Sequence, residues 1–168
     1  MKIEKVGIII FPFGSPSTIP PNRVLGEIGL KKAQELKKAL VYTHHDISIS
    51  KGGEVDVEYF EEKSNKPSTT LQMAREAVKW AKDHHLTELL VIAAKPHLWR
   101  VLRDLSLVIK ESEIKIELRT LPEIEEYPED FWFCSESTQK RTRSKIAWKT
   151  REKILRLIPK ILYKKFVR

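Results

Sequence analysis

A histidine and an arginine stand three residues apart where a buried strand leads directly into a helix. His97 and Arg100 close the stretch Leu89-Leu-Val-Ile-Ala-Ala-Lys-Pro-His-Leu-Trp-Arg100. Residues three apart share a face of a helix, so an imidazole and a guanidinium would lie side by side near its first turn. That end of a helix favours anions and would lower the pKa of His97, which leaves the imidazole neutral. The pair predicts an anion site, in which Arg100 holds the charge and His97 orients the ligand or moves a proton.

The elements that would position this pair have clear signatures. Residues 89–94 form an unbroken apolar run, which is typical of a central strand buried on both faces of a parallel sheet. Pro96 suits the first turn of a helix. Apolar residues then recur at helical spacing, at Leu98, Val101, Leu102, Leu105 and Ile109. Since His97 and Arg100 lie off that stripe, we expect them to project into a cleft beside the ends of the first two strands.

Strands and helices alternate along the rest of the chain. Further strands are predicted at 5–11, 46–50, 55–60 and 113–119, and helices at 22–42, at 68–84 with Ser68 to Thr70 as the cap, and in the C-terminal segment. Only residues 51–54 separate the second and third strands, too few for a parallel crossover, so a β-hairpin is expected there. The order predicts one three-layer, Rossmann-like α/β domain over 1–168 with a mostly parallel sheet, and ligands beyond the carboxyl ends of its strands.

Composition narrows the class of protein. The chain has 168 residues, of which 41% are hydrophobic and 32% charged, as expected of a globular domain in water. The single Cys134 excludes an internal disulfide, and no apolar run approaches the ~20 residues that span a bilayer. The first residues lead directly into a strand, so no signal peptide is expected. Together these features favour the cytoplasm.

The net charge of +8 is concentrated in one part of the chain. Residues 138–168 hold 12 lysines and arginines and one acid, Glu152, whereas residues 1–137 hold 19 basic and 22 acidic residues. The C-terminal segment reads as a basic helix interrupted by Pro159, with Ile154, Ile158, Ile161 and Leu162 on one stripe. That stripe either docks on the domain, leaving Lys149, Lys153 and Lys160 exposed, or belongs to a helix that binds nucleic acid, an anionic membrane or a partner.

Two other loops are expected beside the His97 loop. Ser15, in the loop 14–18, would help to bind a phosphate with backbone N–H groups. Gly52 and Gly53 suit a close backbone approach to a ligand and suit a hairpin turn equally well. The histidine pairs 44–45 and 84–85 fall near predicted helix C-termini, where they complement the dipole. Adjacent residues point about 100° apart on a helix, so neither pair predicts a metal site.

The order of these motifs resembles the YdcF/SanA/ElyC-type domains, a family catalogued as a domain of unknown function. Pro96-His-Leu-Trp-Arg100 resembles its His-x-x-Arg motif, and Ile49-Ser-Lys-Gly-Gly53 resembles the ending of its second strand. Glu62 followed by Ser68-Thr-Thr70 resembles its Glu, then Ser and Thr, before a helix, and Arg23 falls where the family often has an arginine. The resemblance covers roughly residues 5–120.

The chain departs from the family pattern in three places. It has Phe11-Pro-Phe-Gly14 where the family has a glycine-rich loop, residues 54–60 in place of a helix, and Gln72-Met73 in place of Glu-Asn. The resemblance implies a Rossmann-like fold, a suspected enzymatic or ligand-binding role and a cell-envelope link for some members. The sequence therefore predicts a small phosphorylated or nucleotide-like ligand, and it leaves the cofactor, the reaction and the oligomeric state unknown. Besides the catalytic candidate His97, the expected ligand-binding residues are Gly14, Ser15, Arg23, Gly52, Gly53, Glu62, Thr69, Thr70 and Arg100.

Overall fold

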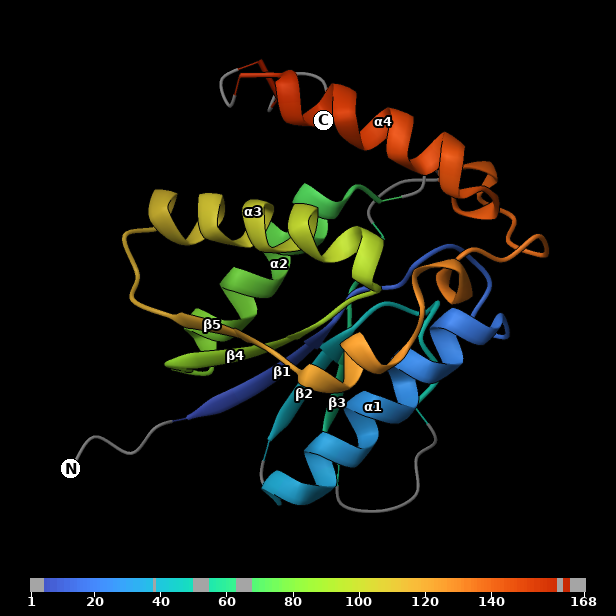
Figure 1. The fold of residues 1–168 in the computed structure, drawn as a ribbon. Helices are drawn as coiled ribbons and strands as arrows, with labels where there is room; N and C mark the ends of the chain where they lie inside the picture. Colours follow the sequence, from blue (N-terminus) through green and yellow to red (C-terminus); the bar gives the residue numbers. More distant parts are fainter. Residues whose placement is uncertain (1–4, 38, 50–54, 63–67, 160–161, 164–168) are drawn as a thin grey trace.

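A five-stranded parallel sheet forms the centre of the protein (Figure 1). The structure is a computed structural model that describes residues 5–37, 39–49, 55–62, 68–159 and 162–163. The strands are β1 (Val6–Ile10), β2 (Leu40–Thr43), β3 (Val57–Tyr59), β4 (Glu88–Ile92) and β5 (Glu117–Thr120), in the order β3-β2-β1-β4-β5. In register, Ile8 of β1 lies between Val41 of β2 and Leu90 of β4. This α/β architecture is consistent with a Rossmann-like domain.

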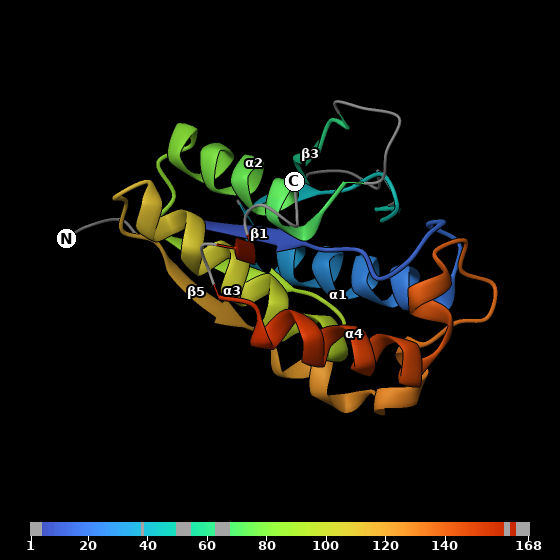
Figure 2. The ribbon, with the colours of Figure 1, turned by 90° about the horizontal axis from the view of Figure 1, so that it is seen from above.

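Helices cover both faces of the sheet. Helices α2 (Thr70–Asp83) and α3 (Lys95–Glu111) pack on one face, and α1 (Pro20–Leu36) packs on the other (Figures 1 and 2). The short 3-10 turns η1 (Pro122–Glu126) and η2 (Glu129–Trp132) follow β5, and η3 (Lys140–Arg143) precedes α4 (Lys145–Leu157). Helix α4 lies beyond α3, on the side away from the sheet (Figure 1). Among the described residues, no helix is both long and apolar enough to cross a membrane.

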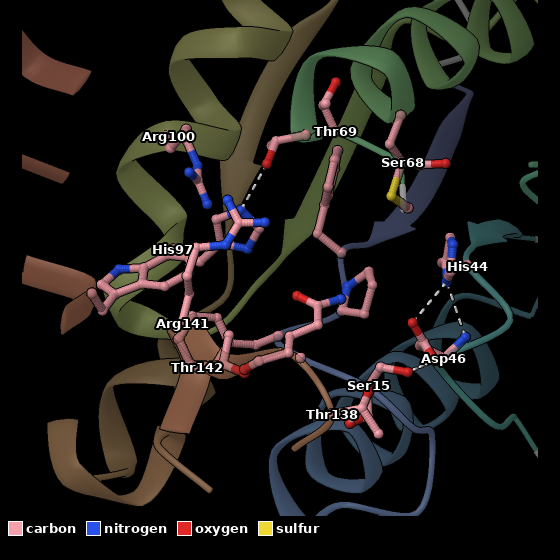
Figure 3. A pocket seen from close by; sticks show the side chains of 18 of the residues that line it. Ser15, His44, Asp46, Ser68, Thr69, His97, Arg100, Thr138, Arg141 and Thr142 are labelled. Carbon is pink, nitrogen blue, oxygen red and sulfur yellow. Dashed lines mark hydrogen bonds and ion pairs between the residues drawn. The ribbon is translucent and has the colours of Figure 1, made fainter. Parts of the chain in front are cut away.

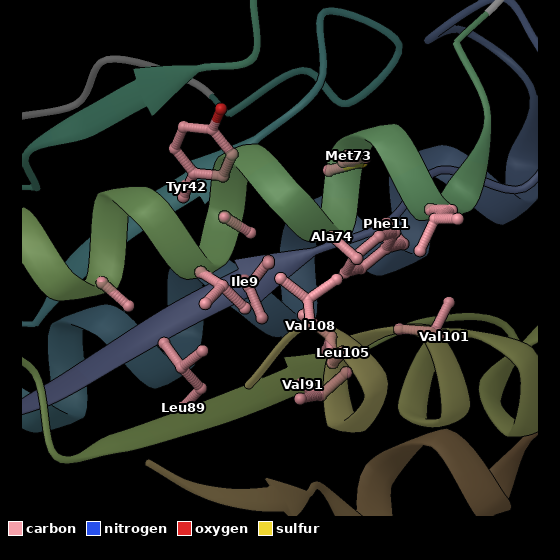
Figure 4. Close-up of a cluster of buried hydrophobic side chains, with 14 of the residues drawn as sticks. Ile9, Phe11, Tyr42, Met73, Ala74, Leu89, Val91, Val101, Leu105 and Val108 are labelled. Atoms are coloured by element: carbon pink, nitrogen blue, oxygen red, sulfur yellow. The ribbon is translucent and has the colours of Figure 1, made fainter. Parts of the chain in front are cut away.

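Alternate residues of the central strands feed two hydrophobic cores. Ile9 and Val91 point toward α2 and α3, where they pack with Val101 and Leu105 (Figure 4). Their neighbours in sequence point the opposite way, because successive strand residues alternate between faces, and they form the second core with Leu25 of α1. Every residue of β4 is buried and β4 pairs with β1 and β5. The prediction of an internal strand before His97 is therefore confirmed.

The predicted hairpin is wrong. Helix α1 ends at Leu36, with Lys37 in the left-handed conformation at its C-cap, and β2 occupies 40–43 rather than 46–50. Strands β2 and β3 run parallel, with Val41 opposite Val57. Residues 44–56 connect them, which is about the dozen that a parallel crossover needs. Leu40 continues the helical spacing of Leu36, so the sequence pattern predicted a helix that extends through the residues of β2.

Helix α4 is docked, but through a different face from the predicted one. Trp148, Glu152 and Leu155 are buried, whereas Ile154 and Leu162 are 57% and 46% exposed. Ile158 is half-buried, Lys149 and Lys153 are exposed as expected, and Ile161 and Lys160 lie outside the described residues. The indole Nε1 of Trp148 donates a hydrogen bond of 3.0 Å to the Pro96 carbonyl. This indole and the buried Glu152 determine which face of α4 packs on the domain, and neither residue belongs to the predicted aliphatic stripe. The helix ends before Pro159, as that proline predicted.

The loop after β1 is held by one buried amide. The Asn22 side chain accepts a hydrogen bond from the Phe13 N–H at 2.9 Å and donates to the carbonyls of Gly14 and Pro16, both at 3.1 Å. Asn22 is fully buried, so water cannot replace its side chain as the hydrogen-bond partner of these backbone groups. The amide therefore fixes the loop at the carboxyl end of the first strand.

We expect Asn22→Ala to lower the free energy of unfolding by about 2–4 kcal/mol, because it leaves several buried backbone groups unpaired. Urea denaturation followed by circular dichroism measures this change. Gln34→Ala, at an exposed position of the same helix, serves as the control and should change stability little. Equal stability of the two variants would show that the loop does not depend on the amide.

Candidate functional site

A cavity of about 750 Å³ opens at the carboxyl ends of β1 and β2 (Figure 3). Four groups of residues line it: the loop 11–15 after β1, residues 44–46 after β2, the start of α2 with Glu62 and Ser68, and the start of α3. Residues from 138 to 163, in and around η3 and α4, line its remaining side. Strand ends and helix starts thus meet at one edge of the sheet, as this fold class favours.

The cavity brings together most of the predicted site residues. Its lining includes Gly14, Ser15, Glu62, Thr69, Thr70, His97 and Arg100. Arg23 is exposed on α1 and is not among the lining residues, while Gly52 and Gly53 lie outside the described residues.

Several lining residues were missed by the sequence analysis. His44, His45 and Asp46 directly follow β2 rather than a helix C-terminus. Placing a strand at 40–43 would have marked them, because polar residues after a strand of a parallel sheet face its ligand-binding edge. No such signal marked Arg141 or Arg151 as site residues, because the basic segment 138–168 contains many other lysines and arginines.

One end of the cavity is cationic. Arg100, Arg141 and Arg151 all line it, and Figure 3 shows Arg100 extending from α3 toward His97. Arg100 is 5% exposed, and its Nη1 lies 3.0 Å from Oε1 of the equally buried Glu152. Burial lowers the pKa of Arg100, against the attraction of Glu152. Burial and the charges of Arg100 and Arg141 lower the pKa of Arg151 to about 10. Buried Asp104 also attracts Arg100, but it is paired with Arg103 at 3.2 Å. The cluster therefore carries more positive charge than the nearby carboxylates balance.

His97 lies among aromatic rings beside this cluster. Its ring centroid is 6.0 Å from that of Phe13 and 5.5 Å from that of Trp148. Nε2 lies 3.1 Å from the Thr70 hydroxyl, while the buried Nδ1 has no hydrogen-bond partner among the described residues. Burial, followed by the charges of Arg100 and Arg151, holds the pKa of His97 well below its usual value, and the Pro12 carbonyl opposes only the smallest part of that shift. The imidazole is thus neutral, as predicted, but burial rather than the helix dipole is the main cause.

The opposite end of the cavity holds a chain of hydrogen bonds. The Ser15 hydroxyl donates to Asp46 Oδ1 at 2.8 Å, and His44 Nδ1 lies 3.3 Å from Asp46 Oδ2. His44 Nε2 lies 3.0 Å from Glu62 Oε1. Burial alone would lower the pKa of His44, but its hydrogen bonds to the two carboxylates outweigh burial and raise it. In the same way, the bonds from His44 and Ser15 lower the pKa of Asp46 against burial. This end can accept a ligand hydroxyl or exchange a proton near neutral pH.

The capping box of α2 fixes the threonine next to His97. The Thr69 hydroxyl accepts from the Gln72 N–H, and the Gln72 side chain accepts from the Thr69 N–H. Thr70 follows as the first residue of the helix. Gln72 stands where the resembled family has a glutamate, and the cap is formed nonetheless. Within the described part of the chain, no group of three or more His, Cys, Asp or Glu is arranged to hold a metal ion.

Comparison of the chain with protein-family models, with curated proteins and with solved structures found no match.

His44→Gln and His97→Gln should change the pH dependence of stability in opposite directions. The folded-state pKa of His44 is raised, so its contribution is complete below the unfolded value of about 6.5 and is lost as pH rises through the folded value. The folded-state pKa of His97 is lowered, so its contribution is complete above about 6.5 and is lost as pH falls toward the folded value.

Denaturant unfolding at a series of pH values tests both signs, and each variant is the control for the other. Relative to the variant, the native His97 protein should lose up to about 1.4 kcal/mol per pH unit on acidification below about pH 6.5. The His44 effect should be smaller, because solvent screens a half-buried group. Differences from the native protein that do not vary with pH would contradict the charge states assigned to the two rings.

Proposed function

We propose that the protein binds a small phosphorylated ligand in this cavity, with its phosphate held by Arg100, Arg141 and Arg151. One observation carries the proposal: three arginines face the cavity, and of the two buried carboxylates near them Glu152 pairs with Arg100 and Arg151, whereas Asp104 pairs with Arg103. Guanidinium groups bind phosphate oxygens through charged, paired hydrogen bonds. The start of α3 adds the positive end of a helix dipole, which favours an anion.

The size and the second end of the cavity support a nucleotide-like ligand. A volume of about 750 Å³ is within the range of cofactor and nucleotide pockets. Ser15, His44 and Asp46 then lie at the end opposite the arginines (Figure 3). Hydroxyl groups such as those of a ribose would bind there through hydrogen bonds.

An enzymatic role is a further part of the proposal, and it divides the work of the two histidines. The lowered pKa of His97 suits a neutral ring that orients the ligand. The raised pKa of His44 suits a group that gives up or takes a proton. Membership of the YdcF/SanA/ElyC-type family stays a prediction. In its favour, five of the matched residues line one cavity, namely Glu62, Thr69, Thr70, His97 and Arg100, whereas the matched Arg23 does not.

Replacing a cavity arginine should weaken phosphate binding. We expect Arg100→Gln and Arg141→Gln each to raise the dissociation constant of adenosine monophosphate by about ten- to a hundredfold, the range for a hydrogen bond to a charged group. Isothermal titration calorimetry on the full chain measures it. Arg75→Gln, at an exposed position of α2, is the matched control and should bind as the native protein does.

Arg141→Gln is the more informative of these two variants. Arg141 is exposed, so its loss leaves no buried charge behind, whereas the loss of Arg100 leaves Glu152 without its partner. Unchanged binding of the nucleotide and of inorganic phosphate by folded Arg141→Gln, or no binding by the native protein, would overturn the proposal.

A second candidate function rests on the outer face of α4. Ile146, Ile154 and Leu157 are 79%, 57% and 83% exposed there, beside the exposed Lys149 and Lys153. Exposed aliphatic residues flanked by lysines on one helix favour an anionic membrane surface over nucleic acid, because apolar side chains gain nothing from phosphate backbones. We propose lipid-surface binding as the alternative role of this helix.

Sedimentation with vesicles tests the alternative. Vesicles that contain phosphatidylserine should bind the native protein, and Leu157→Ser should reduce that binding several-fold because it removes an aliphatic group from the interface. Leu36→Ser, at a 40% exposed leucine of α1, is the control. Equal binding to neutral vesicles, no effect of Leu157→Ser, or salt-sensitive binding to duplex DNA alone would contradict a lipid surface as the partner.

A further inference from the structure

We infer that the cavity selects the dianionic phosphate of a monoester, and that Glu152 is the residue that limits the preferred charge of the ligand to two. The inference rests on the proposed function and names the class of ligand for the same site. Glu152 is outside the predicted set of site residues and is the one acid of the basic segment 138–168.

Glu152 lies behind the arginines rather than in the cavity. Its Oε1 is 3.0 Å from Arg100 Nη1 and 3.7 Å from Arg151 Nη1, and its side chain is 7% exposed. Arg100 and Arg151 line the cavity, and Glu152 is not among the lining residues. The carboxylate therefore contacts two guanidinium groups from the protein side and leaves their other edges for a ligand.

The pairing leaves hydrogen-bonding capacity unused. The Nε of Arg100 is buried and has no hydrogen-bond partner among the described residues, although Arg100 is in an ion pair. Both carboxylate oxygens of Glu152 also lack a hydrogen bond of good geometry there. A buried donor of a charged group is destabilising while it stays unpaired. The Arg100 guanidinium therefore keeps hydrogen-bonding capacity beyond its ion pair with Glu152.

The charges of the cluster add to +2. Arg100, Arg141 and Arg151 contribute three positive charges and Glu152 one negative charge. Asp104, which also attracts Arg100, is offset by its ion-pair partner Arg103, and the neutral His97 contributes no charge. Attraction grows with the charge of the ligand, but the penalty for removing an ion from water grows faster. The ligand charge that binds most tightly therefore rises with the net charge of the cluster. A phosphate monoester carries close to two charges at neutral pH and offers three acceptor oxygens.

Three probes of one chemical series test this selection on the full chain at a pH of about 8: dimethyl phosphate with one charge, methyl phosphate with two, and methyl diphosphate with three. Calorimetric titration at constant ionic strength gives the dissociation constants. The native protein should bind methyl phosphate at least about tenfold more tightly than dimethyl phosphate, and no more weakly than methyl diphosphate.

Glu152→Gln should move the preference to higher charge. With the cluster at +3, the affinity for methyl diphosphate should rise several-fold relative to methyl phosphate. Glu152→Asp keeps the charge and should keep the native order, and Glu126→Gln, at an exposed position of η1, is the matched control. A carboxylate that only positions Arg100 would instead give Glu152→Gln a uniform loss for all three probes, which would overturn the inference.

The outcomes separate this inference from the proposed function. Equal affinity of the native protein for dimethyl phosphate and methyl phosphate would overturn the charge selection while phosphate binding stands. No affinity for any probe would overturn both. If Glu152→Gln does not fold, the order of the three probes on the native protein and on Glu152→Asp decides the question.

Discussion

The ion pair between Arg100 and Glu152 is the interaction on which the architecture of the site depends. It joins α3, which follows the central strand, to α4, and both side chains are about 5% exposed. A buried charge without its partner is strongly destabilising, so each residue requires the other. The Arg100 guanidinium also lies 4.8 Å from the centre of the Trp148 ring, and that indole is bonded to the Pro96 carbonyl. The basic C-terminal helix is thereby placed over the cavity, where it supplies Arg151.

A second set of contacts ties the loop after β1 to the same C-terminal segment. Gly14 has φ of 90°, and a Cβ there would lie 2.5 Å from the Ser137 hydroxyl and 2.6 Å from that of Thr142. Only glycine fits this close approach without strain. The Thr138 N–H donates to the Ser15 carbonyl at 2.7 Å. Charge adds to this attachment, because the acidic stretch after β5 pairs with the basic helix, as in the contact of 3.0 Å between Lys149 and Glu129. The basic segment is therefore partly neutralised by the domain on which it packs.

Structural features that depend on local sequence patterns could be predicted, whereas features that depend on tertiary contacts could not. The apolar run before Pro96 and the threonines at the start of α2 identified a central strand, two helix starts and the lining residues Thr69, Thr70, His97 and Arg100, because burial and capping leave strong local signals. The boundary between α1 and β2 was not predicted, because Leu40 continues the helical spacing of α1. For that reason the prediction of a helix C-terminus at His44 and the prediction of a hairpin were both wrong. The pairing of Arg100 with Glu152 spans residues far apart in the chain, and no spacing rule indicates it.

Locating a bound anion would test the central claim most directly. Tungstate has the shape and charge of phosphate, and its anomalous scattering marks its position in a crystal of the full chain. The account predicts one tungstate in the cavity, with its oxygens at hydrogen-bond distance from the guanidinium groups of Arg100, Arg141 and Arg151. Tungstate bound only on the exposed lysines of α4, with the arginine cluster vacant at saturating concentration, would contradict it.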